Sequence, residues 1–139
     1  MTLHMRTHDE PSEVGRDVVL APLRAYNLSQ ADKQTALPLL VTLSDESGNE
    51  VGGLWGETAH DWLFVESVFV PEDFRSNGFG TALMLEAERE AKSRGCIGIW
   101  LDTYEFQAPA FYKKLGFEVF GTLENSSNEL QRYFLKKRL

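Results

Sequence analysis

The sequence has little cysteine, no long apolar run and fewer basic than acidic residues. Its single cysteine, Cys96, excludes an intramolecular disulfide and a cysteine-rich zinc site. No stretch approaches the ~18 apolar residues that cross a bilayer, and residues 1–6 lack the apolar core of a signal peptide. We therefore expect a cytoplasmic protein with no membrane partner.

Basic residues are outnumbered, with 14 Lys and Arg against 21 Asp and Glu, for a net charge of −7. Nucleic-acid binding depends largely on Lys and Arg neutralising phosphates, so a nucleic-acid partner is not expected. An acidic surface attracts basic substrates, although acidity also serves simply to keep a protein in solution. A phosphate ligand would have to be held by local donors.

The 139 residues, with 42% hydrophobic and 25% charged side chains, fit one domain spanning 1–139. His4, His8 and His60 are scattered without the spacing of metal ligands, so no metal site is predicted. Neither a Gly-Lys-Ser/Thr phosphate loop nor a Gly-x-Gly-x-x-Gly fingerprint is present, which removes the main support for nucleotide hydrolysis and dinucleotide redox chemistry.

The N-terminal third predicts a helix over 14–27, with Ser12 as its N-cap and Pro22 kinking or dividing it. Residues 1–11 are read as a loose start with at most a short edge strand, and 27–35 as a loop. Apolar runs at 37–43 and 51–56, separated by turn residues, predict a β-hairpin.

The middle of the chain predicts a strand, a helix and a second strand. The nearly continuous apolar run 62–70 indicates a central strand buried on both faces, with Glu66 as its one charge. An amphipathic helix over 81–94 ends before Gly95, and 96–101 form the next strand. A helical crossover between two strands implies that they are parallel.

The C-terminal part predicts a short helix within 107–117 and a closing hairpin of 117–123 with 132–135. The fold class is therefore mixed α/β: a central, mostly antiparallel sheet of six to seven strands with three to four helices. An exposed last strand, 133–139, would suit a homodimer.

The stretch 69–83 joins the central strand to the long helix through Arg75-x-x-Gly78-x-Gly80. A helix N-terminus offers unpaired N–H groups and partial positive charge, and glycine lets backbone approach a ligand closely. This junction suits a phosphate or pyrophosphate, but the glycines alone fit an ordinary strand–turn–helix junction equally well.

Two motifs about thirty residues apart are, taken together, more specific than the glycines of the stretch 69–83 alone. Arg75-x-x-Gly78-x-Gly80 follows Val68-x-Val70, and Phe111-Tyr112-x-x-x-Gly116-Phe117 lies beyond the next strand. In this combination the sequence resembles the GNAT superfamily of N-acetyltransferases, across roughly 37–139. A second likeness, to small bacterial members, lies in the stretch from Asp102 to Tyr112.

The resemblance implies acetyl-CoA as donor and the GNAT fold. The pantetheine arm would pair with the backbone of the central strand at Val68 and Val70. The pyrophosphate would lie on the loop amides, which belong to Arg75, Ser76, Asn77, Gly78, Phe79, Gly80 and Thr81. Arg75 would contribute mainly through its backbone.

Acetyl transfer to an amine requires an acid for the departing thiolate and removal of a proton from an ammonium group. The resemblance implies Tyr112 as the acid, although a core aromatic would be the ordinary interpretation of this residue. Glu66 is the candidate base: two residues before Val68, it should share that residue's face and be desolvated by the apolar strand, which favours proton acceptance. Pairing with an arginine, or holding the substrate without proton transfer, fits Glu66 equally well.

One position departs from the family pattern, because Glu105 stands where many members carry asparagine, and Gln107 is a candidate replacement. The predicted function is direct transfer of acetyl from acetyl-CoA to a primary amine, on a small molecule or a protein, within a ternary complex. The alternative is a non-catalytic acyl-CoA-binding module. The acceptor's identity does not follow from the sequence.

Overall fold

The chain divides into two compact units, residues 1–35 and residues 36–139. The structure, a computed structural model, describes residues 1–30 and 36–139. The single domain expected from the sequence stays a prediction. None of the described helices is long and apolar enough to cross a membrane.

The first unit is built on one helix, α1, Glu13–Gln30. Ser12 caps it as predicted, because its Oγ accepts a hydrogen bond from the Gly15 N–H at 3.1 Å. Pro22, which was predicted to kink or divide the helix, does not divide it, because α1 stays one element. The helix also runs three residues beyond Asn27 into the predicted loop, whose remaining positions 31–35 lie outside the described residues. Residues 1–11 contain no strand.

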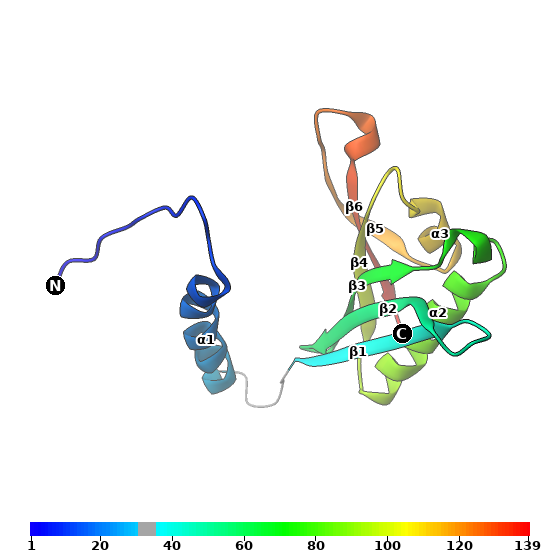
Figure 1. The fold of residues 1–139 in the computed structure, drawn as a ribbon, viewed down its shortest axis with the longest axis horizontal. Helices are drawn as coiled ribbons and strands as arrows, with labels where there is room; N and C mark the ends of the chain where they lie inside the picture. The colour runs from blue at the N-terminus through cyan, green and yellow to red at the C-terminus, as the bar shows by residue number, and fades with distance from the viewer. Residues whose placement is uncertain (31–35) are drawn as a thin grey trace. The chain divides into compact units, whose positions relative to one another are not determined.

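The second unit is a six-stranded sheet in the order β1-β2-β3-β4-β6-β5 (Figure 1). Together with three described α-helices, it confirms the predicted fold class. The strands are β1 Leu37–Ser44, β2 Glu50–Ala59, β3 Trp62–Phe69, β4 Gly98–Tyr104, β5 Glu118–Leu123 and β6 Arg132–Arg138.

Only β3 and β4 are parallel, and every other neighbouring pair is antiparallel. The predicted helical crossover, α2 Phe79–Ser93, connects the parallel pair. β6 lies inside the sheet between β4 and β5. The last strand, which the sequence suggested as an exposed one, is therefore flanked on both sides, with β5 pairing as far as Lys136.

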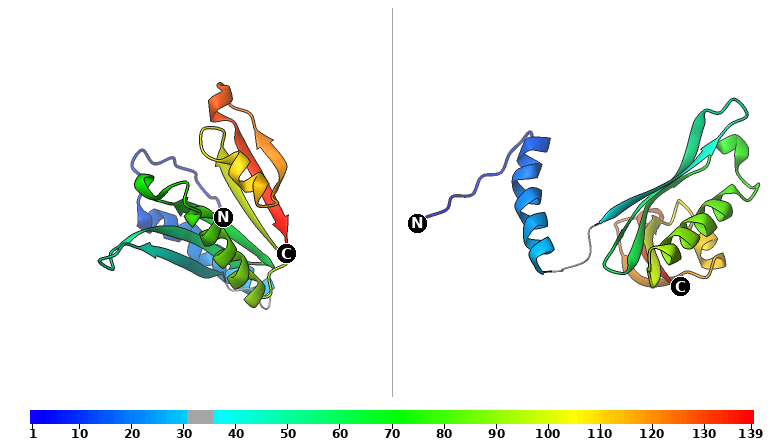
Figure 2. Two further views of the ribbon diagram at one scale, coloured as in Figure 1. Left: turned by 90° about the vertical axis from the view of Figure 1, so that its right-hand side faces the viewer. Right: turned by 90° about the horizontal axis from the view of Figure 1, so that it is seen from below.

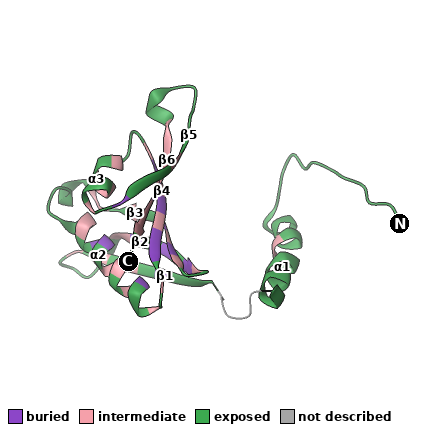
Figure 3. Ribbon diagram, turned by 180° about the vertical axis from the view of Figure 1, so that it is seen from behind, coloured by how far each residue is buried: buried purple, intermediate pink, exposed green. Residues whose placement is uncertain are grey.

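The core lies between the sheet and the two helices α2 and α3, Pro109–Lys114, which cover the same face (Figure 2). Alternate side chains of the strands point into it, and these stretches of strand and of α2 appear buried in Figure 3. The fully buried large side chains are Leu54, Leu63, Leu83, Ile99, Leu101 and Leu135. β3 is central but buries only this face, so the predicted burial of both its faces is wrong.

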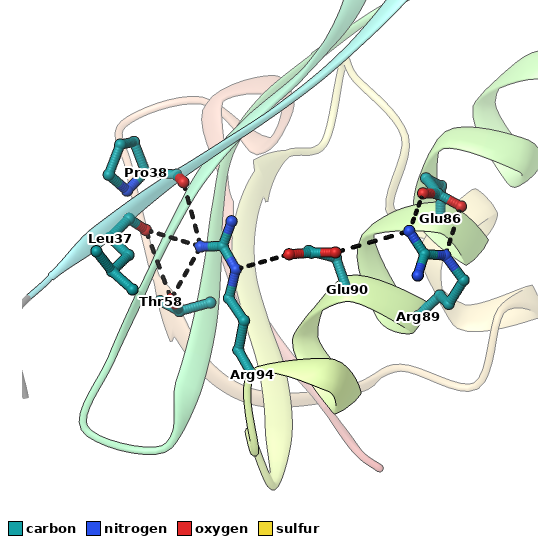
Figure 4. A network of polar contacts seen from close by, with 7 residues as sticks. All are labelled: Leu37, Pro38, Thr58, Glu86, Arg89, Glu90 and Arg94. Carbon is teal, nitrogen blue, oxygen red and sulfur yellow. Dashed lines mark hydrogen bonds and ion pairs between the residues drawn. The ribbon is translucent and has the colours of Figure 1, made fainter.

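The C-terminal end of α2 is tied to the first two strands by Arg94 (Figure 4). Its Nη1 donates to the carbonyl oxygens of Leu37 and Pro38, at 3.2 and 3.1 Å, and to Thr58 Oγ1 at 3.1 Å. Its Nε is paired with Glu90 at 3.1 Å. Gly95 follows with φ of 81°, the left-handed stop that the sequence predicted.

Candidate active site

The central feature of the second unit is a fork between β3 and β4. Their pairing covers only Trp62–Val65 against Gly98–Leu101. Beyond that point β3 continues to Phe69 on β2, and β4 continues to Tyr104 on β6. The facing edges therefore leave unpaired backbone groups, as an extended amide-bearing ligand requires. This separation is the one that the resemblance implied.

A cleft of about 690 Å³ occupies the fork. Its volume lies within the range of small-molecule sites. Val68 and Val70 lie on its β3 side, as predicted for donor contacts, and Tyr112 contributes from α3. The lining also includes Glu66, Ser67, Phe69, Arg75, Leu101, Asp102, Thr103, Tyr104, Phe106, Gln107 and Ala108.

A β-bulge places Glu66 at the start of the fork. In the β2–β3 register Trp55 faces Ser67 and Gly56 faces Val65, so Glu66 is an extra residue without a partner position. A bulge breaks the strand's alternation, and Val65 and Val68 both belong to the core face or pack against it. The prediction that Glu66 and Val68 share a face is therefore wrong.

Glu66 is also exposed rather than desolvated. The sequence argument treated the whole apolar run as buried, but burial on β3 ends after Val65. The carboxylate is therefore accessible to water and to a cationic ligand, which favours holding an ammonium or ordering a water over the role of a base tuned by burial.

Tyr112 lies in the aromatic cluster of α3 and the following turn. Its ring contacts Phe111 and Phe117 edge to face, with centroids 5.0 and 5.9 Å apart. Burial raises the pKa of Tyr112 above its ordinary value of 10.0. The hydroxyl is therefore protonated at neutral pH and, from the wall of the cleft, can donate a proton to a leaving group.

The two glycines of the loop have different structural roles: Gly78 adopts a positive φ, and Gly80 allows close packing against Phe111. Gly78 caps α2 with φ of 84° and has open space around it. A Cβ on Gly80 would meet the Phe111 ring at 3.2 Å, so this position brings α3 against α2. The first bond within α2 runs from Ala82 N–H to the Gly78 carbonyl oxygen. The amides from Phe79 to Thr81 precede it and remain available to an anion.

Side chains of the loop hold its shape. Arg75 Nε donates to the Val70 carbonyl oxygen at 2.9 Å, and its guanidinium lies 5.8 Å from the centroid of Phe69. Asn77 Nδ2 donates to the carbonyl oxygens of Phe74 and Arg75 at 3.3 and 3.2 Å. Ser76 adopts a positive φ of 65°. These contacts fix the loop that precedes the free amides of α2.

Gln107, the candidate replacement for the family's asparagine, holds the turn that follows β4. Its Oε1 accepts from the Tyr104 N–H at 2.9 Å and from Thr103 Oγ1 at 3.2 Å, closing the turn after β4. Its amide nitrogen remains as a donor on the cleft wall. Glu105 is hydrogen-bonded instead to Tyr133, raising the pKa of that phenol.

The weaker candidates lie away from this cleft. Cys96 precedes β4 rather than opening it, and burial raises the pKa of its thiol, which disfavours a nucleophilic role. His60 is exposed in the turn between β2 and β3, as expected. Among the described residues, no group of three or more His, Cys, Asp or Glu side chains could hold a metal ion.

The sequence matches the model of the Acetyltransferase (GNAT) family over residues 6–117. This match covers most of the chain, including both motifs around the cleft. The chain belongs to the GNAT acetyltransferase family. Members of this family use acetyl-CoA, and the cleft with its open strand edge fits that donor, although Arg75 is the only residue of the loop 75–81 that lines it.

Two relatives named as acetyltransferases cover most of the GNAT chain. Acetyltransferase Atu2258 from Agrobacterium fabrum is 38% identical over 117 residues, which are 84% of this chain and 85% of the relative. Blasticidin-S acetyltransferase from Streptomyces morookaense is 34% identical over 119 residues, 84% of this chain and 88% of the relative.

A crystal structure of a protein described as an acetyltransferase, from Agrobacterium tumefaciens, has the same fold. It aligns with a TM-score of 0.92 and 33% identity, over 99% of this chain and 100% of that chain. The family, the fold and the acetyltransferase class therefore rest on relatives that span nearly the whole molecule.

Three features of the GNAT site were missed by sequence reasoning. The bulge at Glu66 depends on which β2 residues face β3, a register that the strand's own sequence does not reveal. Asp102 lines the cleft and is paired with Arg132 at 2.8 Å. Arg132 also lies between the rings of Tyr104 and Phe134, 5.6 and 5.1 Å from their centroids. The sequence signal for this ion pair was the position of Asp102 within a strand predicted to be buried.

Proposed function

We propose that this GNAT protein transfers the acetyl group of acetyl-CoA directly to a primary amine in a ternary complex. The observation that carries the proposal is the fork beyond Val65, which opens one cleft to an unpaired strand edge, to Arg75 of the loop before α2 and to the Tyr112 side chain. A thioester bound along that edge would bring its pyrophosphate to the helix amides and its acyl end into the cleft.

The donor would be held by two sets of backbone groups. Val68 and Val70 would pair with the pantetheine arm, while the amides of the loop from Arg75 to Thr81 would receive the pyrophosphate. A backbone N–H near Val68 would polarise the acetyl carbonyl. The Arg75 side chain is already bonded to the Val70 carbonyl oxygen, which agrees with a backbone role for this residue toward the ligand.

Proton movement would involve two side chains on the cleft wall. Tyr112 would donate its phenolic proton to the departing thiolate sulfur, because burial keeps the hydroxyl protonated. Glu66, exposed at the bulge, would accept the ammonium proton through an intervening water or orient that ammonium. If Glu66 carries the proton, Glu66→Gln lowers kcat. If Glu66 only orients the amine, Glu66→Gln raises KM and leaves kcat nearly unchanged.

The acceptor is expected to be a primary amine on a small molecule or a protein. A small molecule is supported by the name of the Streptomyces morookaense relative, an acetyltransferase for blasticidin S. The net charge of −7 supports a basic acceptor. A cytoplasmic location and a homodimer stay predictions from the sequence.

The test combines calorimetry with acetyl-CoA and release of free thiol over a panel of amines. We expect acetyl-CoA binding in the absence of acceptor and thiol release that depends on an amine. Absence of acetyl-CoA binding would contradict the proposal. Binding without transfer to any amine, unchanged in Tyr112→Phe, would instead identify the non-catalytic acyl-CoA-binding module.

A further inference from the structure

The point where β3 and β4 separate carries one acidic residue on each strand. The last paired residues are Val65 and Leu101, so Glu66 on β3 and Asp102 on β4 are the first residues beyond the pairing. Both line the cleft in the fork. The cleft therefore begins between two carboxyl side chains, one contributed by each of its walls.

Asp102 is held on its wall by an arginine from the neighbouring strand. Nε and Nη2 of Arg132 both lie 2.8 Å from Asp102 Oδ1. The guanidinium is itself fixed between two rings, 5.6 Å from the centroid of Tyr104 and 5.1 Å from that of Phe134. Arginine presents a planar set of donors, so it orients the carboxylate. Because both contacts use Oδ1, the second oxygen, Oδ2, can accept a hydrogen bond from a ligand.

The charged side chains on the cleft wall favour a cation at this end of the cleft. They are Glu66, Asp102 and Arg75. Arg75 is bonded to the carbonyl oxygen of Val70, beyond the end of β3. Arg132 balances Asp102, and Glu66 forms no ion pair with another described residue. The start of the fork therefore has one acidic side chain more than it has basic ones, which matches a single ammonium group.

Glu88 forms a comparable ion pair outside the cleft. Its Oε2 lies 2.9 Å from Lys137 Nζ, and its side chain is 18% exposed, against 17% for Asp102. The two carboxylates have similar burial, and each joins another element to β6. Asp102 lines the cleft, whereas Glu88 does not. This difference in position separates a binding role from a structural one, and it makes Glu88 a matched control.

We infer that Asp102 binds the ammonium group of the acetyl acceptor from the β4 wall, opposite Glu66. The inference rests on the proposed function and adds that the acceptor enters the fork as a cation, which selects alkylamines over uncharged aromatic amines. A primary ammonium has three N–H donors, enough to reach both side chains. Asp102 would hold the group through Oδ2 in a charge-assisted hydrogen bond, while Glu66 orients it or accepts its proton.

The first experiment places an ammonium group at this point without requiring the acceptor's identity. S-(2-aminoethyl)-CoA and S-propyl-CoA differ only in their last group, an ammonium or a methyl, and as thioethers neither can transfer an acyl group. Calorimetry compares their affinities for the wild-type protein. We expect the ammonium compound to bind roughly threefold to tenfold more tightly, a range typical of one net hydrogen bond. Equal affinities would overturn the inference.

The second experiment tests which residue is responsible for the preference. Asp102→Asn should remove most of the preference for the ammonium compound, because a neutral amide attracts an ammonium less strongly, and should leave the affinity for S-propyl-CoA unchanged. Glu88→Gln makes the matching change at a similarly buried position and should retain the full preference. A full preference in Asp102→Asn would show that the carboxylate only joins β4 to β6, and would contradict the inference.

A double variant removes the ion pair without leaving a single charge behind. Asp102→Asn leaves Arg132 without its carboxylate, which destabilises a partly buried pair. Asp102→Leu combined with Arg132→Met replaces both charges by apolar side chains and keeps the net charge at −7. Loss of the ammonium preference in this variant supports binding by Asp102, because the overall charge is unchanged. A retained preference would overturn the inference.

Turnover gives an independent readout over the amine panel. Asp102→Asn should raise KM for alkylamines by roughly threefold to tenfold with little change in kcat, whereas Glu88→Gln should alter neither. A fall in kcat at unchanged KM would contradict a binding role. A protein that binds acetyl-CoA, and both thioethers with equal affinity, keeps the proposed function and loses this inference. A protein that binds none of the three compounds loses the proposed function.

Discussion

The two halves of β3 differ sharply although they belong to one strand. From Trp62 to Val65 the strand is paired on both edges, and its core-facing side chains Leu63 and Val65 are buried. From Glu66 to Phe69 only the β2 edge is paired, and three of the four residues are exposed. We call Trp62–Val65 the closed half, which stabilises the sheet. We call Glu66–Phe69 the open half, which leaves backbone groups free for a ligand.

This division predicts that variants will separate into two classes. Changes in the closed half should lower the free energy of unfolding without altering intrinsic donor affinity. Changes around the open half should alter binding or turnover while leaving the fold intact. The following variants test that separation, from the largest expected effect to the smallest.

Tyr112→Phe should lower kcat by roughly 100-fold or more, the usual contribution of a positioned acid, while acetyl-CoA affinity stays unchanged in calorimetry. Because burial raises the pKa of Tyr112, the wild-type activity that depends on this proton should be lost only above pH 10.0, its ordinary value. Tyr133→Phe is the control, since that hydroxyl bonds Glu105 outside the cleft. Equal kcat in the two variants would contradict the acid role.

Leu63→Ala should destabilise the protein by about 2–5 kcal/mol, because the side chain is fully buried in the closed half and its loss leaves a cavity. Urea unfolding measures the change. At a temperature where the variant is folded, its acetyl-CoA affinity should match that of the wild type. A large loss of affinity in the folded variant would show that the two halves are coupled.

Gly78→Ala should weaken acetyl-CoA binding by roughly fivefold to thirtyfold, because alanine disfavours the positive φ that sets the loop in front of the α2 amides. Gly95→Ala is the matched control at the other end of α2. Its φ of 81° is close to the 84° of Gly78, and neither added Cβ would meet an atom within 4 Å. Both variants should lose similar stability, and only Gly78→Ala should lose affinity.

Glu88→Gln should cost about 1 kcal/mol or less of stability. Burial opposes ionisation of Glu88, but Lys137 at 2.9 Å and Lys92 at 3.3 Å outweigh it and lower the pKa of the carboxyl. A lowered folded-state pKa stabilises the protein above the carboxyl's ordinary pKa of 4.5 and loses that contribution as pH falls further. Urea unfolding near pH 7 and below pH 4 should show the variant's deficit only at the higher pH.

The sequence predicted features that depend on near neighbours. The cap at Ser12 and the left-handed stop at Gly95 follow from local backbone chemistry, and the structure has both. The parallel pair followed from the helical crossover. The fork was expected only through the family resemblance, because no local pattern reveals where two strands separate.

The errors concern residues whose surroundings come from distant parts of the chain. Glu66 was expected to be desolvated because its sequence neighbours are apolar, but its spatial surroundings are set by the bulge against Trp55 and Gly56. The last strand was expected to be exposed, yet it lies between β4 and β5. Both outcomes depend on strand pairing, which apolar periodicity does not specify.

The bulge at Glu66 also divides β3 into two segments that can evolve separately. Before it, Trp62 and Phe64 line a hollow on the face of the sheet opposite α2 and α3, while after it Val68 packs toward the helices. Substitutions at Trp62 and Phe64 could therefore accumulate without disturbing the backbone that would hold the donor. A deletion at Glu66 would remove this independence, because it would lock both segments into one alternation.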